Sequence, residues 1–172
     1  MPSRKFIGLA FVTLMFLALS SSSSSSSFAA KPSEPPAVPF KGNAEEQAIS
    51  AVPVDADHVF VVTVGEGHAT DLGHFTFVSP HLSGLIDFSI AGTQTFTAAN
   101  GDELDADIVG KLHPIVDADG HVFLTGHIDA TITGGTGRFA NASGSFTFSI
   151  LFDTETFHSI AEIDGTIRFA GK

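Results

Sequence analysis

Apolar and polar residues alternate with a period of two in almost every long segment between residues 58 and 169. From Leu104 to Leu112, apolar or small residues take every second position, and charged residues take most of the positions between them. Successive side chains of a β-strand point to opposite faces, so this pattern predicts strands with one buried and one solvent-facing side. The same alternation recurs over residues 122–132, 146–152 and 163–169.

Four further apolar segments, separated by turn residues such as Asn-Gly and Asp-x-Asp-Gly, complete the predicted set of strands. They span residues 58–64, 73–78, 85–90 and 93–98. About eight short strands joined by such turns are typical of an antiparallel barrel or sandwich. We predict an all-β fold with a single closed antiparallel barrel of about eight strands, because closure removes strand edges that would otherwise need protection.

A glycine-rich segment interrupts the alternation between residues 132 and 148. Glycine adopts positive φ at little steric cost. Gly134, Gly135 and Gly137 therefore predict a tight reversal or a β-bulge, and Gly144 predicts a second one.

Residues 1–29 have the organisation of a secretory signal peptide. Two basic residues precede an apolar run from Phe6 to Leu19, and a serine tract then leads to small residues around Ala29. The run is shorter than the roughly 18 apolar residues of a membrane span, and the small residues predict cleavage after Ala29. We therefore expect a secreted or periplasmic protein, with an uncleaved anchor as the alternative.

Residues 30–39 contain four prolines among polar and small residues and predict an extended linker. The β-barrel domain is then expected to span residues 40–172, a length that suits one domain. The chain has no cysteine. Neither disulfides nor a lipid attached to cysteine can contribute, so folding must depend on an apolar core.

The chain is strongly acidic, with a formal net charge of −11. Removal of residues 1–29 would take away Arg4 and Lys5 and leave six basic residues against 19 acidic ones. Nucleic acids and anionic membranes both require a positively charged face. We expect no nucleic-acid partner and, after cleavage, no membrane partner; the composition makes no prediction of the oligomeric state. The 17 phenylalanines, with no Tyr or Trp, predict core packing and disfavour a lectin.

The glycine-rich sequence 134–139 (Gly-Gly-Thr-Gly-Arg-Phe), followed by Ala-Ser-Gly at 142–144, resembles the strand-turn-strand element of dirigent proteins and allene oxide cyclases. It is more similar still to a loose group of exported, functionally uncharacterised proteins with that barrel. Residues 67–73 and 98–102 also resemble patterns of this group, which often has histidine where Asp71 stands here. The resemblance covers roughly residues 40–169. It implies a small eight-stranded antiparallel barrel with a possible apolar cavity, and it carries the fold better than any activity.

His68, Asp71 and His74 are the weak candidates for a metal site, because two imidazoles and a carboxylate can hold a metal ion. Their spacing matches no helical or knuckle arrangement, and Gly67 and Gly73 explain the segment as a loop. We therefore expect no metal and no cofactor.

Arg138 lies within the glycine-rich turn and is one of two arginines in the expected domain. Its guanidinium is expected to pair with a carboxylate or with backbone carbonyls and so hold that turn; a clamp for an anionic substrate is the alternative. Asn100 and Asp102 are further candidates for ligand binding or structural support. No serine stands in a nucleophile-elbow pattern and no phosphate-binding loop is present, so we predict no catalytic residue.

Two classes of function fit these features. The leading hypothesis is an exported, non-catalytic barrel that binds a small apolar ligand, or that acts as a structural or interaction module if its interior is filled. The alternative is a cyclase or isomerase, or a dirigent-type stereo-directing protein, whose apolar cavity folds a reactive substrate. The interior distinguishes them: a void with a few convergent polar groups indicates a ligand or substrate, and a packed interior indicates a structural role.

Overall fold

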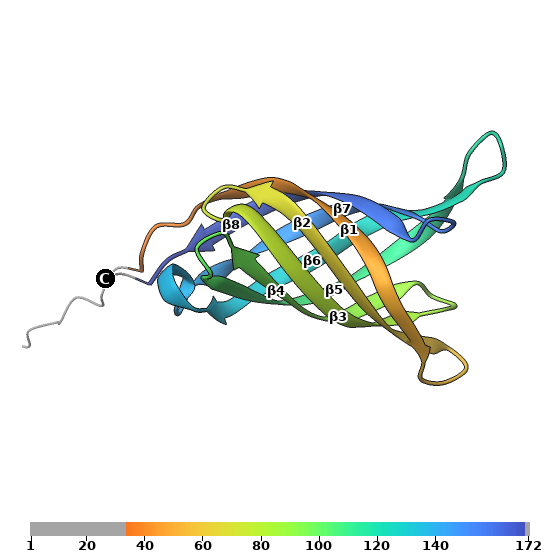
Figure 1. Ribbon diagram of the computed structural model, residues 1–172, viewed down its shortest axis with the longest axis horizontal. Coiled ribbons are helices and arrows are strands. Elements are labelled where there is room, and N and C mark those ends of the chain that lie inside the picture. Colours follow the sequence, from red (N-terminus) through yellow and green to blue (C-terminus); the bar gives the residue numbers. More distant parts are fainter. Residues whose placement is uncertain (1–33, 171–172) are drawn as a thin grey trace, which may run out of the picture. The chain divides into compact units, whose positions relative to one another are not determined.

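The structure is a computed structural model that describes residues 34–170. Eight strands form a closed barrel in which each strand pairs antiparallel with the next and the last pairs with the first (Figure 1). The predicted fold class is therefore confirmed. The strands are β1 (Val38–Pro53), β2 (His58–Ala69), β3 (Gly73–Gly84), β4 (Ser89–Ala98), β5 (Glu103–Val116), β6 (Val122–Gly135), β7 (Ser143–Asp153) and β8 (His158–Arg168).

The strand count agrees with the sequence, but two of the individual predictions were wrong. β1 was not predicted, because its inward positions include Ala44 and the partly buried Glu46, which give little apolar alternation. The segments 85–90 and 93–98 were predicted as two strands and instead contribute to the single strand β4. Leu85 and Ile86 lie in the turn before it and are 53% and 74% exposed.

The predicted signal peptide, residues 1–29, and residues 30–33 of the predicted linker lie outside the described residues. β1 begins at Val38, two residues before the expected start of the barrel domain. Within residues 34–170, no helix is long and apolar enough to cross a membrane.

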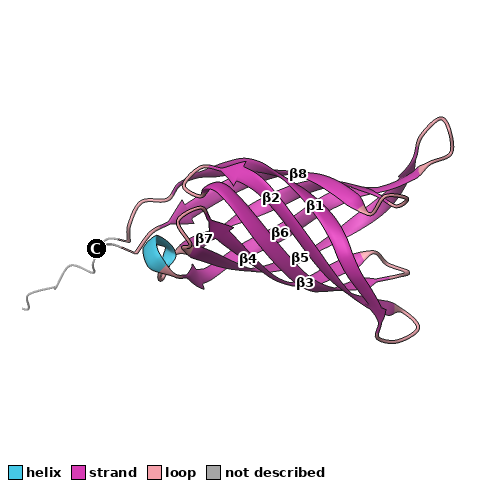
Figure 2. Cartoon of the chain, viewed as in Figure 1, coloured by secondary structure: helices cyan, strands magenta, loops and turns pink. Residues whose placement is uncertain are grey.

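The two ends of the barrel carry different connections (Figure 2). The turns β1–β2, β3–β4, β5–β6 and β7–β8 project from one end, which we call the open end. The other three connections lie at the opposite end, which we call the closed end, together with the start of β1 and the end of β8. A 3-10 helix, η1 (Gly137–Phe139), lies in the β6–β7 connection at the closed end.

Phenylalanine side chains fill the half of the barrel near the closed end. Phe96 is fully buried, and its ring contacts those of Phe75 and Phe146 edge-to-face, with centroid distances of 5.3 and 5.9 Å. Aromatic rings favour this arrangement because the positive edge of one meets the negative face of the other. Phe40 and Phe139 are also 0% exposed. The closed-end half is therefore a packed core.

The glycine-rich segment contains the predicted bulge. The pairing of β5 with β6 shifts register between Asp105 and Ala106, opposite Gly134, whose φ is +143°. Gly144 differs from the prediction, because it lies within β7 and pairs with both Ile132 and Ile167.

Candidate functional site

The half of the barrel near the open end is hollow. A cavity of about 390 Å³ occupies its interior, and Leu85 and Phe157 line the cavity where it reaches the turns of the open end. A cavity of this volume is in the range of small-molecule sites. The packed half forms the floor, since Phe148 lines the cavity and also contacts Phe96 of the core, with 6.3 Å between ring centroids.

The cavity has two chemically different sides. Strands β5, β6 and β7 contribute only apolar side chains, and we call these residues the apolar wall: Ile108, Leu112, Leu124, Ile128, Phe148, Ile150 and Phe152. Every polar lining residue comes from β1 to β4, and we call these residues the polar wall: Glu46, Thr63, Ser79, His81, Ser83 and Gln94. A molecule in the cavity therefore meets hydrogen-bonding groups on one side only, where they lie among apolar residues such as Val59, Val61 and Ile90.

Strand register brings the polar wall together. Thr63 of β2 pairs directly with Ser79 of β3, and Thr63 pairs on its other side with Ala48, two positions beyond Glu46 on β1. Ser79 and His81 continue the inward face of β3 that begins with Phe75 and Phe77. The face thus changes from aromatic to polar where the barrel changes from packed to hollow.

Glu46 is the acidic group of the polar wall. One of its carboxyl oxygens, Oε1, accepts a 2.6 Å hydrogen bond from the hydroxyl of Ser159 on β8. Burial raises the pKa of the Glu46 carboxyl, because it disfavours the charged form, and the bond from Ser159 only partly opposes this effect. The Thr63 hydroxyl lies near the same carboxyl but outside hydrogen-bond geometry.

Two further polar side chains of the wall are almost fully buried without using their hydrogen-bonding capacity. Thr63 is 7% exposed, and its hydroxyl oxygen has no hydrogen-bond partner among the described residues. Gln94 is 3% exposed, and no hydrogen bond between described residues uses its side-chain amide. Leaving buried polar groups unpaired costs free energy, so their persistence inside a cavity indicates that a ligand or solvent meets them.

His81 presents a basic nitrogen to the same wall. Its Nδ1 lies 3.0 Å from the carbonyl oxygen of Ser79. A carbonyl can only accept a hydrogen bond, so Nδ1 carries the proton and Nε2 carries the lone pair of the neutral ring. Burial lowers the pKa of His81, which keeps the ring neutral at pH 7.

Replacement of Glu46 by glutamine is expected to stabilise the ligand-free protein at pH 7. A raised carboxyl pKa means that the folded state binds the proton more tightly, so the stability due to Glu46 is complete below the ordinary pKa and is lost as pH rises through the raised pKa. The gain from Glu46→Gln should be about 1 kcal/mol at pH 7 and should vanish near pH 4. Urea denaturation at both pH values measures it.

The neighbouring Glu45 provides the control for that measurement, because it is exposed on the outer face of β1. Glu45→Gln removes the same charge without removing a buried carboxyl. An equal change in unfolding free energy for the two variants would contradict the effect of burial at Glu46.

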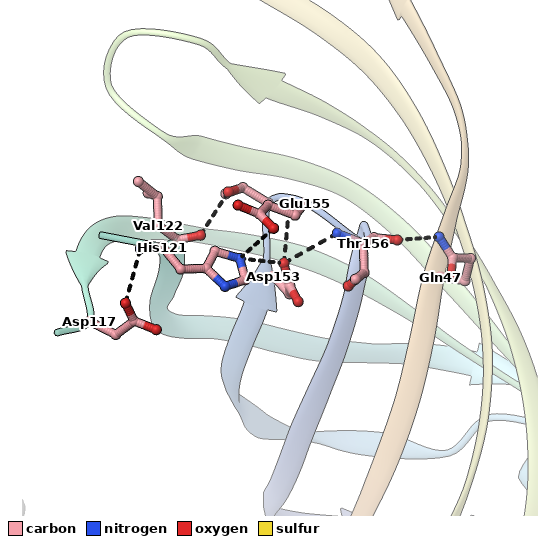
Figure 3. Close-up of polar contacts among 8 residues, drawn as sticks. Gln47, Asp117, His121, Val122, Asp153, Glu155 and Thr156 are labelled. Carbon is pink, nitrogen blue, oxygen red and sulfur yellow. Dashed lines mark hydrogen bonds and ion pairs between the residues drawn. The ribbon is translucent and has the colours of Figure 1, made fainter. Parts of the chain in front are cut away.

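A polar network fixes the β7–β8 turn at the rim of the cavity (Figure 3). On one side, His121 Nε2 lies 2.9 Å from Asp153 Oδ1 and links this turn to the β5–β6 turn. On the other side, the Gln47 amide donates to the carbonyl oxygens of Thr156 and Phe157. Phe157, which lines the cavity, is thus held with a φ of +58°.

The carboxylate of Asp153 is the centre of this network. Burial acts to raise the pKa of Asp153. Backbone N–H donors from Glu155 and Thr156 and the His121 ring outweigh this effect and hold the pKa at about 2. Asp153 therefore stays ionised at neutral pH, as its bonds to the turn require.

The residues predicted as a ligand-binding or structural site lie at the closed end and do not line the cavity. Asp102 accepts hydrogen bonds from the backbone N–H of Arg138 and the side chain of Asn100, which hold its pKa below the ordinary range. The bond from Arg138 comes from its backbone, and its guanidinium lies 4.7 Å from the centroid of the Phe139 ring. These three residues brace the β4–β5 and β6–β7 connections.

The weak metal candidates are only partly brought together. His68 and His74 pair across β2 and β3, with ring centroids 5.0 Å apart, and His74 lies 3.8 Å from Glu66. Asp71 lies in the turn beyond them with a φ of +66°. Across residues 34–170, no group of three His, Cys, Asp or Glu residues is arranged to hold a metal ion.

The polar wall was missed in the sequence. A usable signal was present in β3, where the alternating face Phe75, Phe77, Ser79, His81 keeps its phase while its chemistry changes. Polar residues in phase with a buried face indicate either solvent or a polar cavity. Gln94 carries the same signal in β4, where it is in phase with Phe96 and Ala98.

No protein-family model and no curated protein matches the chain. Two matching solved structures are of dirigent proteins, the family that the glycine-rich segment resembles. The pterocarpan synthase dirigent protein GePTS1 is 14% identical with a TM-score of 0.45, and the match covers 83% of this chain and 90% of that one. The pterocarpan synthase dirigent protein PsPTS1 is 13% identical with a TM-score of 0.49, covering 81% and 99%.

Proposed function

We propose that this protein is a stereo-directing barrel that holds a small, mostly apolar substrate in one orientation while it cyclises or isomerises. The observation that carries the proposal is the division of the cavity into a polar wall and an apolar wall. Such a cavity binds a two-ended molecule in one sense, with its polar group toward β1–β4 and its hydrocarbon toward β5–β7. Orientation alone can decide which face of a reactive intermediate closes.

The hollow interior supports this function over a purely structural role. A structural module gains stability from a filled barrel, whereas an unpaired buried group such as the Thr63 hydroxyl reduces stability. Function at the expense of stability is common at binding sites. A carrier that only stores an apolar ligand is the second candidate, and the apolar wall favours it, but storage alone does not require the polar wall. We also propose that the protein acts after export, as the N-terminal sequence predicts.

The proposal is tested with the neutral fluorophore N-phenyl-1-naphthylamine. Its fluorescence should increase on binding, with saturation at one equivalent. An achiral chromophore held in one orientation by a chiral site should also show induced circular dichroism in its absorption band. Binding without induced dichroism would favour the carrier, and no saturable binding would contradict both functions.

Filling the cavity should abolish this binding. Ile150 and Leu151 are neighbours on β7, but Ile150 lines the apolar wall and Leu151 is exposed outside the barrel. We expect Ile150→Trp to reduce probe affinity by about tenfold or more, because the indole occupies the space of the ligand, and Leu151→Trp to leave it unchanged. Equal effects of the two variants would place the probe on the outer surface.

A further inference from the structure

We propose that the polar end of the molecule taken by this cavity is a protonated amine, which pairs with the carboxylate of Glu46. This inference rests on the proposed function and names the chemical class of its substrate. It follows from what the polar wall offers to a ligand, from what the cavity lacks, and from the charge of the whole chain.

The unused groups of the polar wall can all accept hydrogen bonds, and the Gln94 amide nitrogen and the Thr63 and Ser83 hydroxyls can also donate them. The Ser159 hydroxyl bonds only one carboxyl oxygen of Glu46, Oε1, and no hydrogen bond between described residues uses the other. Among residues 34–170, the hydroxyl oxygen of Thr63 has no hydrogen-bond partner and the Gln94 amide oxygen accepts no hydrogen bond. Nε2 of His81 carries a lone pair because Nδ1 is the donor. A set of acceptors around one carboxylate suits an ammonium group, which has three donors and no acceptor.

An anion in the cavity would meet only neutral donors, such as the Gln94 amide. None of the described residues that line it is Lys or Arg, and Glu46 is the one acidic residue among them. A carboxylate or phosphate placed against the polar wall would be buried without a cation and beside an acidic group, which is unfavourable. The net charge of −11 adds a long-range field that attracts cations and repels anions.

Pairing with an ammonium also resolves the cost of keeping an acidic group inside the barrel. A lone buried carboxylate is unfavourable, and a buried ion pair with further hydrogen bonds offsets much of its desolvation. Glu46 therefore destabilises the empty protein, and in the complex it is paired with the ammonium group. The apolar wall then takes the hydrocarbon part of the amine.

The test compares three ligands with the same chain and different head groups: octylamine, octan-1-ol and octanoic acid, as competitors of N-phenyl-1-naphthylamine at pH 7. At this pH the amine is protonated and the acid is ionised. We expect octylamine to bind about tenfold or more tightly than octan-1-ol, because a hydrogen-bonded charge pair adds to the same hydrocarbon contact. Octanoate should bind most weakly.

Two isosteric variants locate the effect. Glu46→Gln should remove the preference for octylamine over octan-1-ol. Glu45→Gln changes the net charge equally but on the outer face of β1, and it should keep the preference for the amine. Moderate salt should weaken a surface attraction much more than the buried pair. The ranking on the unchanged protein is decisive even if Glu46→Gln fails to fold.

The outcomes separate this inference from the proposed function. If the fluorophore and octan-1-ol bind but octylamine binds no better than octan-1-ol, or if octanoate binds best, the proposal of an amine ligand is wrong. The proposed stereo-directing function is not contradicted by these outcomes. If Glu45→Gln and Glu46→Gln weaken amine binding equally, the attraction is one of surface charge and the proposed pair is wrong. If the fluorophore itself does not bind, the proposed function and the inference both fail.

Discussion

Replacement of Phe96 by alanine is expected to lower the free energy of unfolding by about 3–5 kcal/mol, the cost of removing a fully buried aromatic ring. The Phe96 side chain is 0% exposed, and its ring contacts those of Phe75, Phe77, Phe146 and Phe148. These contacts come from β3, which pairs with β4, and from β7, which lies across the barrel interior. No single neighbour can fill the space that the ring leaves, because strand pairing fixes the backbone positions.

Urea denaturation with Phe60→Ala as the matched control tests this expectation. Phe60 is 42% exposed on β2, so the same chemical change there should cost well under half as much. A loss for Phe96→Ala no larger than that for Phe60→Ala would show that the closed-end half does not depend on this ring.

Replacement of Gly135 by valine is expected to destabilise the barrel more than the same change at Gly134. Both glycines have positive φ, +143° at Gly134 and +153° at Gly135, so each valine carries about 1–3 kcal/mol of backbone strain. At Gly135, a Cβ atom would also collide with the carbonyl oxygen of Glu103, whereas the space around Gly134 is open. Of these two glycines, only Gly135 combines strain with a steric clash.

The Glu103 backbone cannot easily move away from such a clash. Its carbonyl oxygen accepts a 2.8 Å hydrogen bond from the backbone N–H of Thr136, and its own N–H donates to the Thr136 hydroxyl at 2.8 Å. Relief of the clash would break the junction of β5 with the β6–β7 connection. Denaturant midpoints of the two valine variants should therefore differ clearly, and equal midpoints would contradict a steric role for Gly135.

The strands near the C-terminus were predictable from residue pattern alone. In β5 to β8, one face has to be buried and the other solvated, so alternation is imposed on residues such as Leu104, Ile128 and Ile163. β1 escaped prediction because its inward face ends at a cavity, where Glu46 replaces an apolar residue. A strand whose inward side chains line a cavity needs fewer apolar residues there, so apolar and polar residues alternate less clearly in its sequence.

The site was less predictable than the fold. Glu46, Thr63, Ser79 and Gln94 come from four different strands, and only strand register and barrel closure place them on one wall. Arg138 and Asp102 were candidates for ligand binding or structural support, and the structure places them at the closed end, where the Arg138 backbone N–H donates to Asp102. The neighbours of a residue in sequence do not indicate which residues lie opposite it across the interior of a barrel.

The sequence by itself determined that this chain forms a closed antiparallel barrel, because period-two burial and glycine-rich turns are local properties that each segment carries alone. Only the tertiary structure decided that half of the barrel is filled by phenylalanine and half is left hollow. That division depends on the total volume that inward side chains from all eight strands occupy at each level of the barrel. Rings such as Phe96 meet and fill one level, whereas small and polar side chains of β1–β4 leave the next level open, with Glu46 at its wall.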